Sequence, residues 1–168
     1  MKLNNILLKP SLLMASIMLV LCSFSSAFAG DKANFSGTWS LDESKSEMGE
    51  FRFADVTKVI TQEENKLVME RTYNGMDGQD MKISETYTLD GKECKNQGMM
   101  NSERVSTVKW SDDSKKLIIK STISFDMGGQ AGSMEITEEI SLSDDGKTLT
   151  VTSSSEMGGT QKIVYVKK

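Results

Sequence analysis

The sequence contains no histidine, a single proline at position 10 and only two cysteines, Cys22 and Cys94. Without histidine, the chain lacks the commonest general base and the commonest metal ligand. The scarcity of proline suits long strands that are hydrogen-bonded without interruption. Only Cys94 follows the apolar N-terminal stretch, which excludes a disulfide framework in a processed chain, and we interpret it as a small buried side chain rather than a reactive thiol.

Catalytic motifs are missing as well. The sequence has neither G-x-S-x-G nor G-x-x-x-x-G-K-[ST], and a Cys94 nucleophile would have no histidine to act as its base. Two pairs of adjacent aspartates, at 112–113 and 144–145, lie in turn-like segments where solvated acids are expected. We therefore expect a protein that is not an enzyme and that carries no cofactor.

The first 29 residues have the pattern of a secretory signal peptide. Lys2 and Lys9 give a positive start, residues 11–24 are almost wholly apolar, and Ala27-Phe28-Ala29 has the small-x-small pattern of a cleavage site. The sequence thus predicts a signal peptide, residues 1–29, and one domain, residues 30–168, that is secreted to the periplasm or beyond the cell.

Two other interpretations of the N-terminal stretch are weaker. A membrane-spanning helix needs about 20 apolar residues, more than this stretch offers, so no transmembrane segment is expected in the mature chain. Lipidation at Cys22 would need a small residue before it, where Leu21 stands. Removing residues 1–29 leaves 18 basic and 24 acidic residues, a net charge of −6 that argues against nucleic acid as a partner.

The remaining chain repeats one hairpin pattern. From Lys66, K-L-V-M-E-R-T-Y is followed by a Gly-rich turn and by M-K-I-S-E-T-Y-T-L-D-G-K, and the pattern returns from Lys116 and, shortened, from Lys147. Apolar and polar residues alternate at period two, as in strands with one buried face. The sequence predicts an all-β, antiparallel up-and-down meander barrel of 8–10 strands. The expected strands are 34–41, 56–63, 66–73, 79–89, 92–96, 103–110, 116–125, 133–142, 148–155 and 161–167.

The connections between these strands fall into two classes, which a meander places at opposite ends of a barrel. One class consists of short, charged turns at 64–65, 90–91, 111–115 and 143–147. The other class, at 42–55, 74–78, 97–102, 126–132 and 156–160, pairs a Met with a nearby Gly in every member. We expect this Met-Gly rim to be the open mouth, with 42–55 as a lid loop. Thioethers also favour Cu(I), but no clustered Met spacing supports a metal site.

Alternation places two carboxylates on otherwise apolar inner faces. Glu85 and Glu138 occupy the same position in M-x-I-x-E, and Arg71 is the nearest predicted partner of Glu85, while Glu138 has only Ser121 opposite. A polar group inside an apolar cavity would orient a small amphipathic ligand. The alternatives are structural water, or an outward-facing register after a bulge. The predicted cavity residues are Met69, Arg71, Tyr73, Met81, Ile83, Glu85, Tyr87, Phe125, Met134 and Glu138.

Two motifs resemble those of the calycins, the superfamily that comprises the lipocalins and the fatty-acid-binding proteins. They are F-x-G-T-W-x-L at 35–41 and the turn Leu89-Asp90-Gly91-Lys92. The resemblance implies a lipocalin-like barrel whose narrow end is closed by Gly37 and Trp39. It also implies an Arg-x-Tyr clamp for a fatty acid near the C-terminus, but this chain has Ile163-Val164-Tyr165 there and lacks the arginine.

The sequence therefore predicts a secreted, non-catalytic, lipocalin-like protein that binds a small apolar or amphipathic molecule inside its barrel. The competing hypothesis is a packed barrel that acts as an interaction or structural protein of the cell envelope through its Met-Gly loops, with an unknown protein partner.

Overall fold

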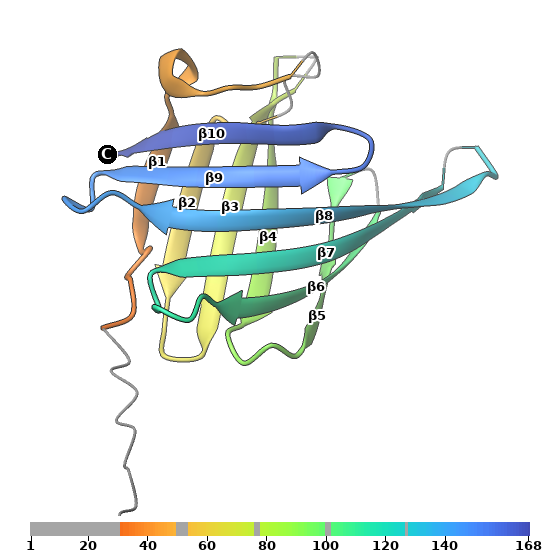
Figure 1. The fold of residues 1–168 in the computed structure, drawn as a ribbon. Coiled ribbons are helices and arrows are strands. Elements are labelled where there is room, and N and C mark those ends of the chain that lie inside the picture. The colour runs from red at the N-terminus through yellow and green to blue at the C-terminus, as the bar shows by residue number, and fades with distance from the viewer. Residues whose placement is uncertain (1–30, 50–53, 76–77, 100–101, 127) are drawn as a thin grey trace, which may run out of the picture.

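The computed structural model describes residues 31–168 except 50–53, 76–77, 100–101 and 127 (Figure 1). The predicted signal peptide, residues 1–29, lies outside this range. The helix whose bounds are described is a single 3-10 turn, η1 (Glu43–Lys45), and the described residues contain no apolar helix of membrane-spanning length. The strands are β1 (Gly37–Leu41), β2 (Thr57–Gln62), β3 (Lys66–Asn74), β4 (Asp80–Thr88), β5 (Glu93–Gln97), β6 (Glu103–Trp110), β7 (Lys116–Asp126), β8 (Ala131–Leu142), β9 (Thr148–Ser155) and β10 (Gly159–Lys167).

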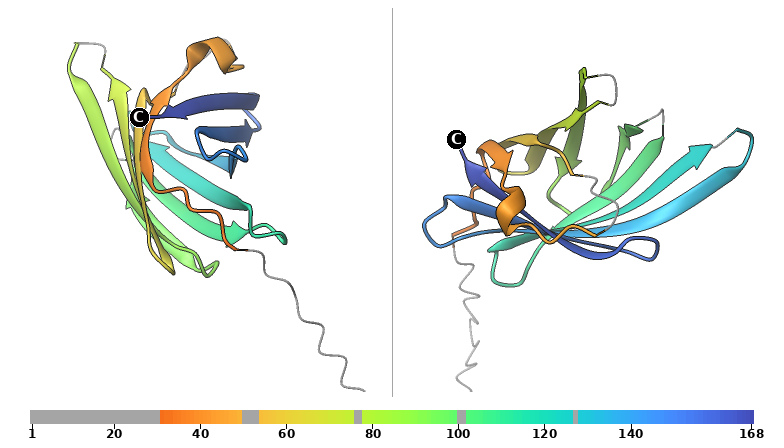
Figure 2. Two further views of the ribbon diagram at one scale, coloured as in Figure 1. Left: turned by 90° about the vertical axis from the view of Figure 1, so that its left-hand side faces the viewer. Right: turned by 90° about the horizontal axis from the view of Figure 1, so that it is seen from above.

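These strands form one antiparallel sheet in the order β4-β3-β2-β1-β10-β9-β8-β7-β6-β5. The sheet curls on itself into a nearly closed barrel, so that its two edge strands, β4 and β5, face each other across a seam (Figure 2). The predicted all-β meander barrel is confirmed, including the short strand β5. Strand bounds agree within one or two residues except for β1, which begins at Gly37 rather than at residue 34.

The seam between β4 and β5 is closed by side chains instead of a backbone ladder. The side-chain amide of Asn96 accepts a hydrogen bond from the backbone N of Thr86 at 2.8 Å and donates one to the carbonyl of Thr86 at 3.1 Å. Closer to the β4–β5 turn, the backbone N of Thr88 lies 3.1 Å from the sulfur of Cys94. Cys94 is half-buried and is the free thiol of the described chain.

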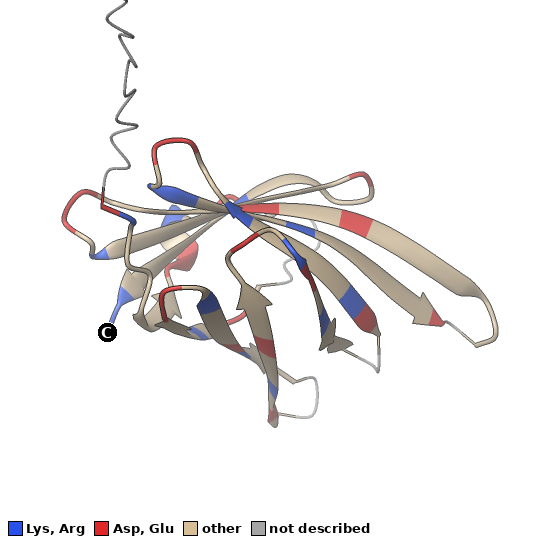
Figure 3. Ribbon diagram, turned by 90° about the horizontal axis from the view of Figure 1, so that it is seen from below, with Lys and Arg blue, Asp and Glu red and all other residues tan. Residues whose placement is uncertain are grey.

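The short turns at 64–65, 90–91, 111–115 and 143–147 lie at one end of the barrel, the closed end. Two of its turns have the same construction: Ser111 donates its hydroxyl hydrogen bond to Asp113, and Ser143 does the same to Asp145, both at 2.6 Å. Each aspartate then accepts from a backbone N two residues later, at 3.0 Å. Such side-chain bonds to the local backbone fix tight turns, and they explain the acidic residues at these positions (Figure 3).

Aromatic side chains close this end. Trp39 is fully buried and donates its indole N–H to the carbonyl of Phe35 at 3.0 Å, while the rings of Phe35 and Trp110 lie 6.0 Å apart. Gly37 has a φ of 150°, and a Cβ there would lie 2.9 Å from the side chain of Lys167, which crosses the Trp39 ring. The predicted structural role of Gly37 and Trp39 at the narrow end is in accord with this packing.

The opposite end is the mouth, where the longer connections lie. Of the predicted lid loop, residues 42–49 follow the edge of β10: Glu47 forms an antiparallel bridge with Lys162, and the backbone N of Val164 donates to the hydroxyl of Ser46 at 2.9 Å. Residues 50–53, like Met76 and Met127 of the predicted Met-Gly rim, lie outside the described residues. Met157 of that rim is 75% exposed. The β7–β8 hairpin is the longest and extends beyond the rest of the mouth (Figure 1).

Candidate functional site

Among the described residues, six charged side chains are buried inside the barrel. Three are cations from β2, β3 and β6, and three are anions from β4, β8 and the segment before β2. They are Lys58, Arg71, Arg104, Glu85, Glu138 and Asp55, and each is at most 8% exposed. We call them the ionic layer. Burial of a charge is costly unless it is paired and hydrogen-bonded, so the partners of each one decide what this layer can do.

Arg71 joins the two carboxylates that the sequence singled out. Its Nε donates to Glu85 at 2.8 Å, and its two terminal nitrogens donate to the two oxygens of Glu138 at 3.1 and 3.2 Å. The predicted pairing of Arg71 with Glu85 is thus confirmed. The bidentate contact to Glu138 is the geometry in which arginine holds a carboxylate most firmly.

Arg104 holds the same two carboxylates from the other side. One terminal nitrogen lies 3.2 Å from Glu85, the other donates to Glu138, and Nε donates to the hydroxyl of Ser121 at 3.0 Å. Ser121 is also 2.9 Å from the hydroxyl of Ser106. The expectation that Glu138 would have no charged partner was therefore wrong, because two arginines contact it.

Lys58 and Asp55 form a further ion pair beside the two arginines and two glutamates. Lys58 contacts both oxygens of Asp55, at 3.1 and 2.9 Å, and its ammonium lies 5.0 Å from the centre of the Tyr165 ring. The Tyr165 hydroxyl donates to Asp55 at 2.9 Å, and Arg71 approaches Asp55 at 3.9 Å. Tyr165, the one residue of the Arg-x-Tyr pattern that this chain retains, therefore contacts a carboxylate of the chain itself.

The charges of this layer control one another's protonation. Burial raises the pKa of Glu138, but Arg71, Arg104 and Lys58 outweigh burial and hold that pKa below its ordinary value of 4.5. Burial also raises the pKa of Asp55, and Lys58 and Arg71 again reverse the effect. For Lys58, burial and the nearby Arg71 keep the pKa below 10.5 despite its two acidic neighbours. Both carboxylates thus remain ionised at neutral pH.

The ionic layer divides the interior into two apolar regions. Toward the closed end the side chains are tightly packed, and Trp39, Leu67, Leu117 and Leu149 have no exposure. Toward the mouth the inner faces stay apolar but only half-buried. The half-buried side chains on these faces are Tyr73, Ile83, Ile123, Phe125, Met134 and Ile136, with Met81 37% exposed beyond them.

The predicted cavity residues are distributed over these regions. Met69 and Tyr87 have no exposure and belong to the hydrophobic core, while Arg71, Glu85 and Glu138 belong to the ionic layer. The remaining five, Tyr73, Met81, Ile83, Phe125 and Met134, lie on the mouth side. The structure thus brings all ten to inner faces at successive heights, and their contact with a ligand stays a prediction.

Three members of the ionic layer were missed by the sequence interpretation. Arg104 lies in E-R-V-S-T-V-K-W, where Val105 and Val108 point to opposite faces, so the alternation alone does not say which face is inner. Lys58 has the same ambiguity between Val59 and Ile60. Asp55 precedes β2 and belongs to no strand. The signal that was available was the number of apolar residues on each face of β6. Arg104 shares its face with Val108 and Trp110, whereas the other face has Val105 alone.

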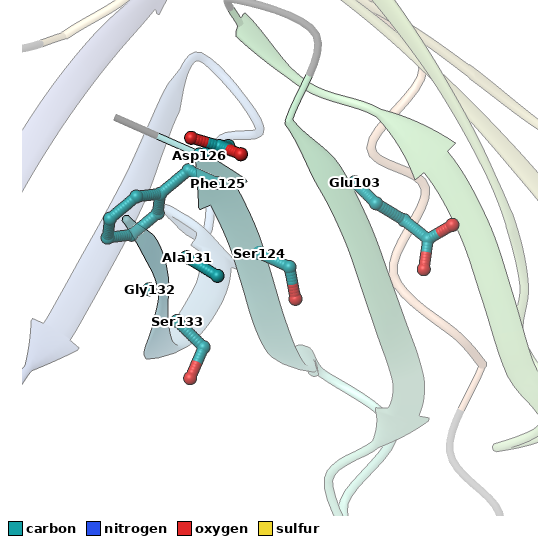
Figure 4. Close-up of a pocket in the computed structure, with 7 residues that line it drawn as sticks. All are labelled: Glu103, Ser124, Phe125, Asp126, Ala131, Gly132 and Ser133. Atoms are coloured by element: carbon teal, nitrogen blue, oxygen red, sulfur yellow. The ribbon is translucent and has the colours of Figure 1, made fainter. Parts of the chain in front are cut away.

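A separate open hollow of about 640 Å³ lies at the end of the β7–β8 hairpin (Figure 4). It is lined by Glu103 and by residues 124–126 and 131–133, most of which are exposed. Phe125 lies over Gly132, where a Cβ would come within 2.6 Å of the ring. Among the predicted cavity residues only Phe125 lines this hollow, so the hollow and the region above the ionic layer share that one predicted residue. In the described chain, no group of three acidic or cysteine side chains is placed to share a metal ion.

Comparison with solved structures finds similar barrels, among them the following two. A fatty acid transporter, REP1-NXSQ, aligns with a TM-score of 0.53 and 14% identity over 79% of this chain and 95% of its own. The zebrafish ileal bile acid-binding protein, complexed with cholic acid, aligns with a TM-score of 0.51 and 18% identity over 81% of this chain and 99% of its own. The fold is a calycin-type barrel. No protein-family model and no curated protein matches this sequence.

The predicted resemblance to calycins is confirmed at the level of the fold. At such low sequence identity, the similarity in fold does not identify a ligand for this chain. A proposal about the ligand has to rest on the geometry of the interior.

Proposed function

We propose that this protein binds a small apolar or amphipathic molecule in the mouth half of its barrel and does not transform it. The observation that carries the proposal is the half-buried apolar lining between the ionic layer and the rim, with Ile83 on one wall and Ile123 and Met134 on the other. An apolar molecule in this position would remove that lining from water, which is the main driving force for binding in such pockets.

The packed closed end supports the same assignment. Because Trp39, Leu67 and Leu149 leave no exposed surface there, the apolar molecule would enter from the mouth and stop at the ionic layer. The similarity of the fold to a fatty acid transporter and to a bile acid-binding protein supports the binding of a ligand in the interior.

The test uses Nile red, an uncharged probe whose fluorescence rises in apolar surroundings. We expect saturable binding to the purified protein. Ile123→Asn on the inner face should weaken this binding about tenfold, whereas Thr122→Asn, on the exposed outer face of the same strand, should change it less than about twofold. Absence of saturable binding, or equal effects of the two substitutions, would contradict the proposal.

Native mass spectrometry of protein purified from its own cells addresses the natural ligand. We expect a lipid-like molecule in stoichiometric amount, released on denaturation. If the protein carries no ligand and does not bind Nile red, the alternative function is favoured. In that case the protein would bind a partner protein through exposed rim side chains such as Met157.

We also propose that residues 1–29 direct export and are removed. Cell fractionation should find the protein in the periplasm or outside the cell, and its N-terminal residue should be Gly30. A cytoplasmic protein that begins at Met1 would contradict this part of the proposal.

A further inference from the structure

The ionic layer is electrically balanced. Lys58, Arg71 and Arg104 supply three positive charges, and Asp55, Glu85 and Glu138 supply three negative charges, and these six are the buried charges of the described chain. A ligand that reaches this layer from the mouth therefore meets a surface of no net charge.

Each side-chain nitrogen of the two arginines already has a partner within the chain. All three side-chain nitrogens of Arg71 contact Glu85 or Glu138, and those of Arg104 contact Glu85, Glu138 and Ser121. Glu85 and Glu138 thus occupy the positions that the carboxylate of an acidic ligand would need.

A carboxylate ligand has two ways to bind beside such a layer, and both are unfavourable. It can leave its charge without a partner in a water-poor interior, or it can displace Glu85 or Glu138 and leave that side chain unpaired. An uncharged polar group, such as a hydroxyl or an ester, has neither penalty because it requires no counter-charge.

Building on the proposed function, we propose that this barrel selects uncharged amphipathic ligands, such as alcohols or esters, over the corresponding carboxylates. The chain's own glutamates take the place of the acid group. Glu138, held by both arginines, is the residue that determines this selectivity.

The experiment compares 1-dodecanol with dodecanoate, both below their aggregation limits, as displacers of Nile red. At pH 8 we expect dodecanol to displace the probe at about tenfold lower concentration than dodecanoate. Equal or stronger displacement by dodecanoate would overturn the inference while leaving the proposed function intact. If neither compound displaces Nile red and the probe itself does not bind, the proposed function fails.

A matched pair of variants tests the role of Glu138. Glu138→Gln gives the interior one net positive charge, so dodecanoate should bind more tightly and the preference for dodecanol should shrink about tenfold or invert. Glu139→Gln removes the same charge from the chain, but Glu139 lies on the outer face and pairs with Lys116 at 2.8 Å, so the preference should be unchanged. The same dodecanoate affinity in both variants would exclude Glu138 as the determinant.

A pH series on the unsubstituted protein keeps the test independent of whether Glu138→Gln folds. As the pH falls from 8 to about 4.5, dodecanoic acid becomes increasingly uncharged, and its displacement curve should approach that of dodecanol. A tenfold difference that persists at low pH would show that charge is not the basis of selection.

Discussion

Asn96 replaces a piece of backbone ladder opposite Thr86. Its side-chain amide makes both hydrogen bonds that a neighbouring strand would make with that residue, one as acceptor and one as donor. The contact lies where β4 and β5 come together without a regular ladder between them. A side chain of one residue thus connects the two edges of the sheet.

The first prediction concerns this contact. Asn96→Leu removes both hydrogen bonds and should lower the free energy of unfolding by about 1–2 kcal/mol, while Asn96→Asp keeps only the acceptor and should lose roughly half as much. Urea unfolding measures the loss, and amide hydrogen exchange at Thr86 should become faster in both variants. Unchanged exchange at Thr86 would mean that the seam is held by other contacts.

The second prediction concerns Arg71. Arg71→Ala leaves Glu85 and Glu138 with one arginine instead of two, in a buried position, and should lower the free energy of unfolding by about 3–5 kcal/mol at pH 7. Lys120→Ala, an exposed position on β7, serves as the comparison and should cost less than about 0.5 kcal/mol. Chemical unfolding monitored by tryptophan fluorescence gives both values, and similar losses for the two variants would contradict the buried network.

The third prediction compares two buried tyrosines. The Tyr165 hydroxyl donates to Asp55, whereas the Tyr87 hydroxyl is buried and has no hydrogen-bond partner among the described residues. Tyr165→Phe should therefore lower the free energy of unfolding by about 1.5–3 kcal/mol, because a hydrogen bond to a charge is lost. Tyr87→Phe should be neutral or raise it by up to about 1 kcal/mol. A large loss in Tyr87→Phe would point to an additional partner of that hydroxyl.

The fourth prediction concerns acid. The pKa values of Glu138 and Asp55 are lower in the folded chain than their ordinary values of 4.5 and 3.8, so their stabilising effect is complete above about pH 4.5 and is lost as the pH falls through the lower, folded-state values. Urea midpoints should decline below pH 4.5. They should vary little between pH 5 and 7, where no imidazole titrates because the chain has no histidine.

Glu138→Gln removes one of these two groups, and its urea midpoint should decline less steeply in acid. Glu139→Gln should follow the unsubstituted protein because its ion pair with Lys116 is partly exposed. Identical acid profiles for all three proteins would contradict the assigned role of Glu138.

The repeated hairpin pattern was sufficient to predict the meander, its ten strands and the inner position of Arg71 and Glu85. In Asp80–Thr88 all apolar residues lie on one face of the strand, and in Lys66–Asn74 all except Val68 do, so one inward face fits each strand. The pairing of Glu138 with Arg71 and Arg104 could not be predicted in the same way. These residues come from β3, β6 and β8, and their contact depends on how the sheet curls across the barrel, which local alternation does not encode.

The ionic layer also separates strand positions that are fully buried from positions that are only half-buried. Side chains below it, such as Leu67 and Leu117, are completely packed, whereas Ile83 and Ile123 above it are only half-covered. Substitutions above the layer therefore create smaller cavities and less strain than substitutions below it. The mouth could be diversified to recognise new molecules while the lower half preserves the fold, which makes this barrel a natural starting scaffold for engineered binders.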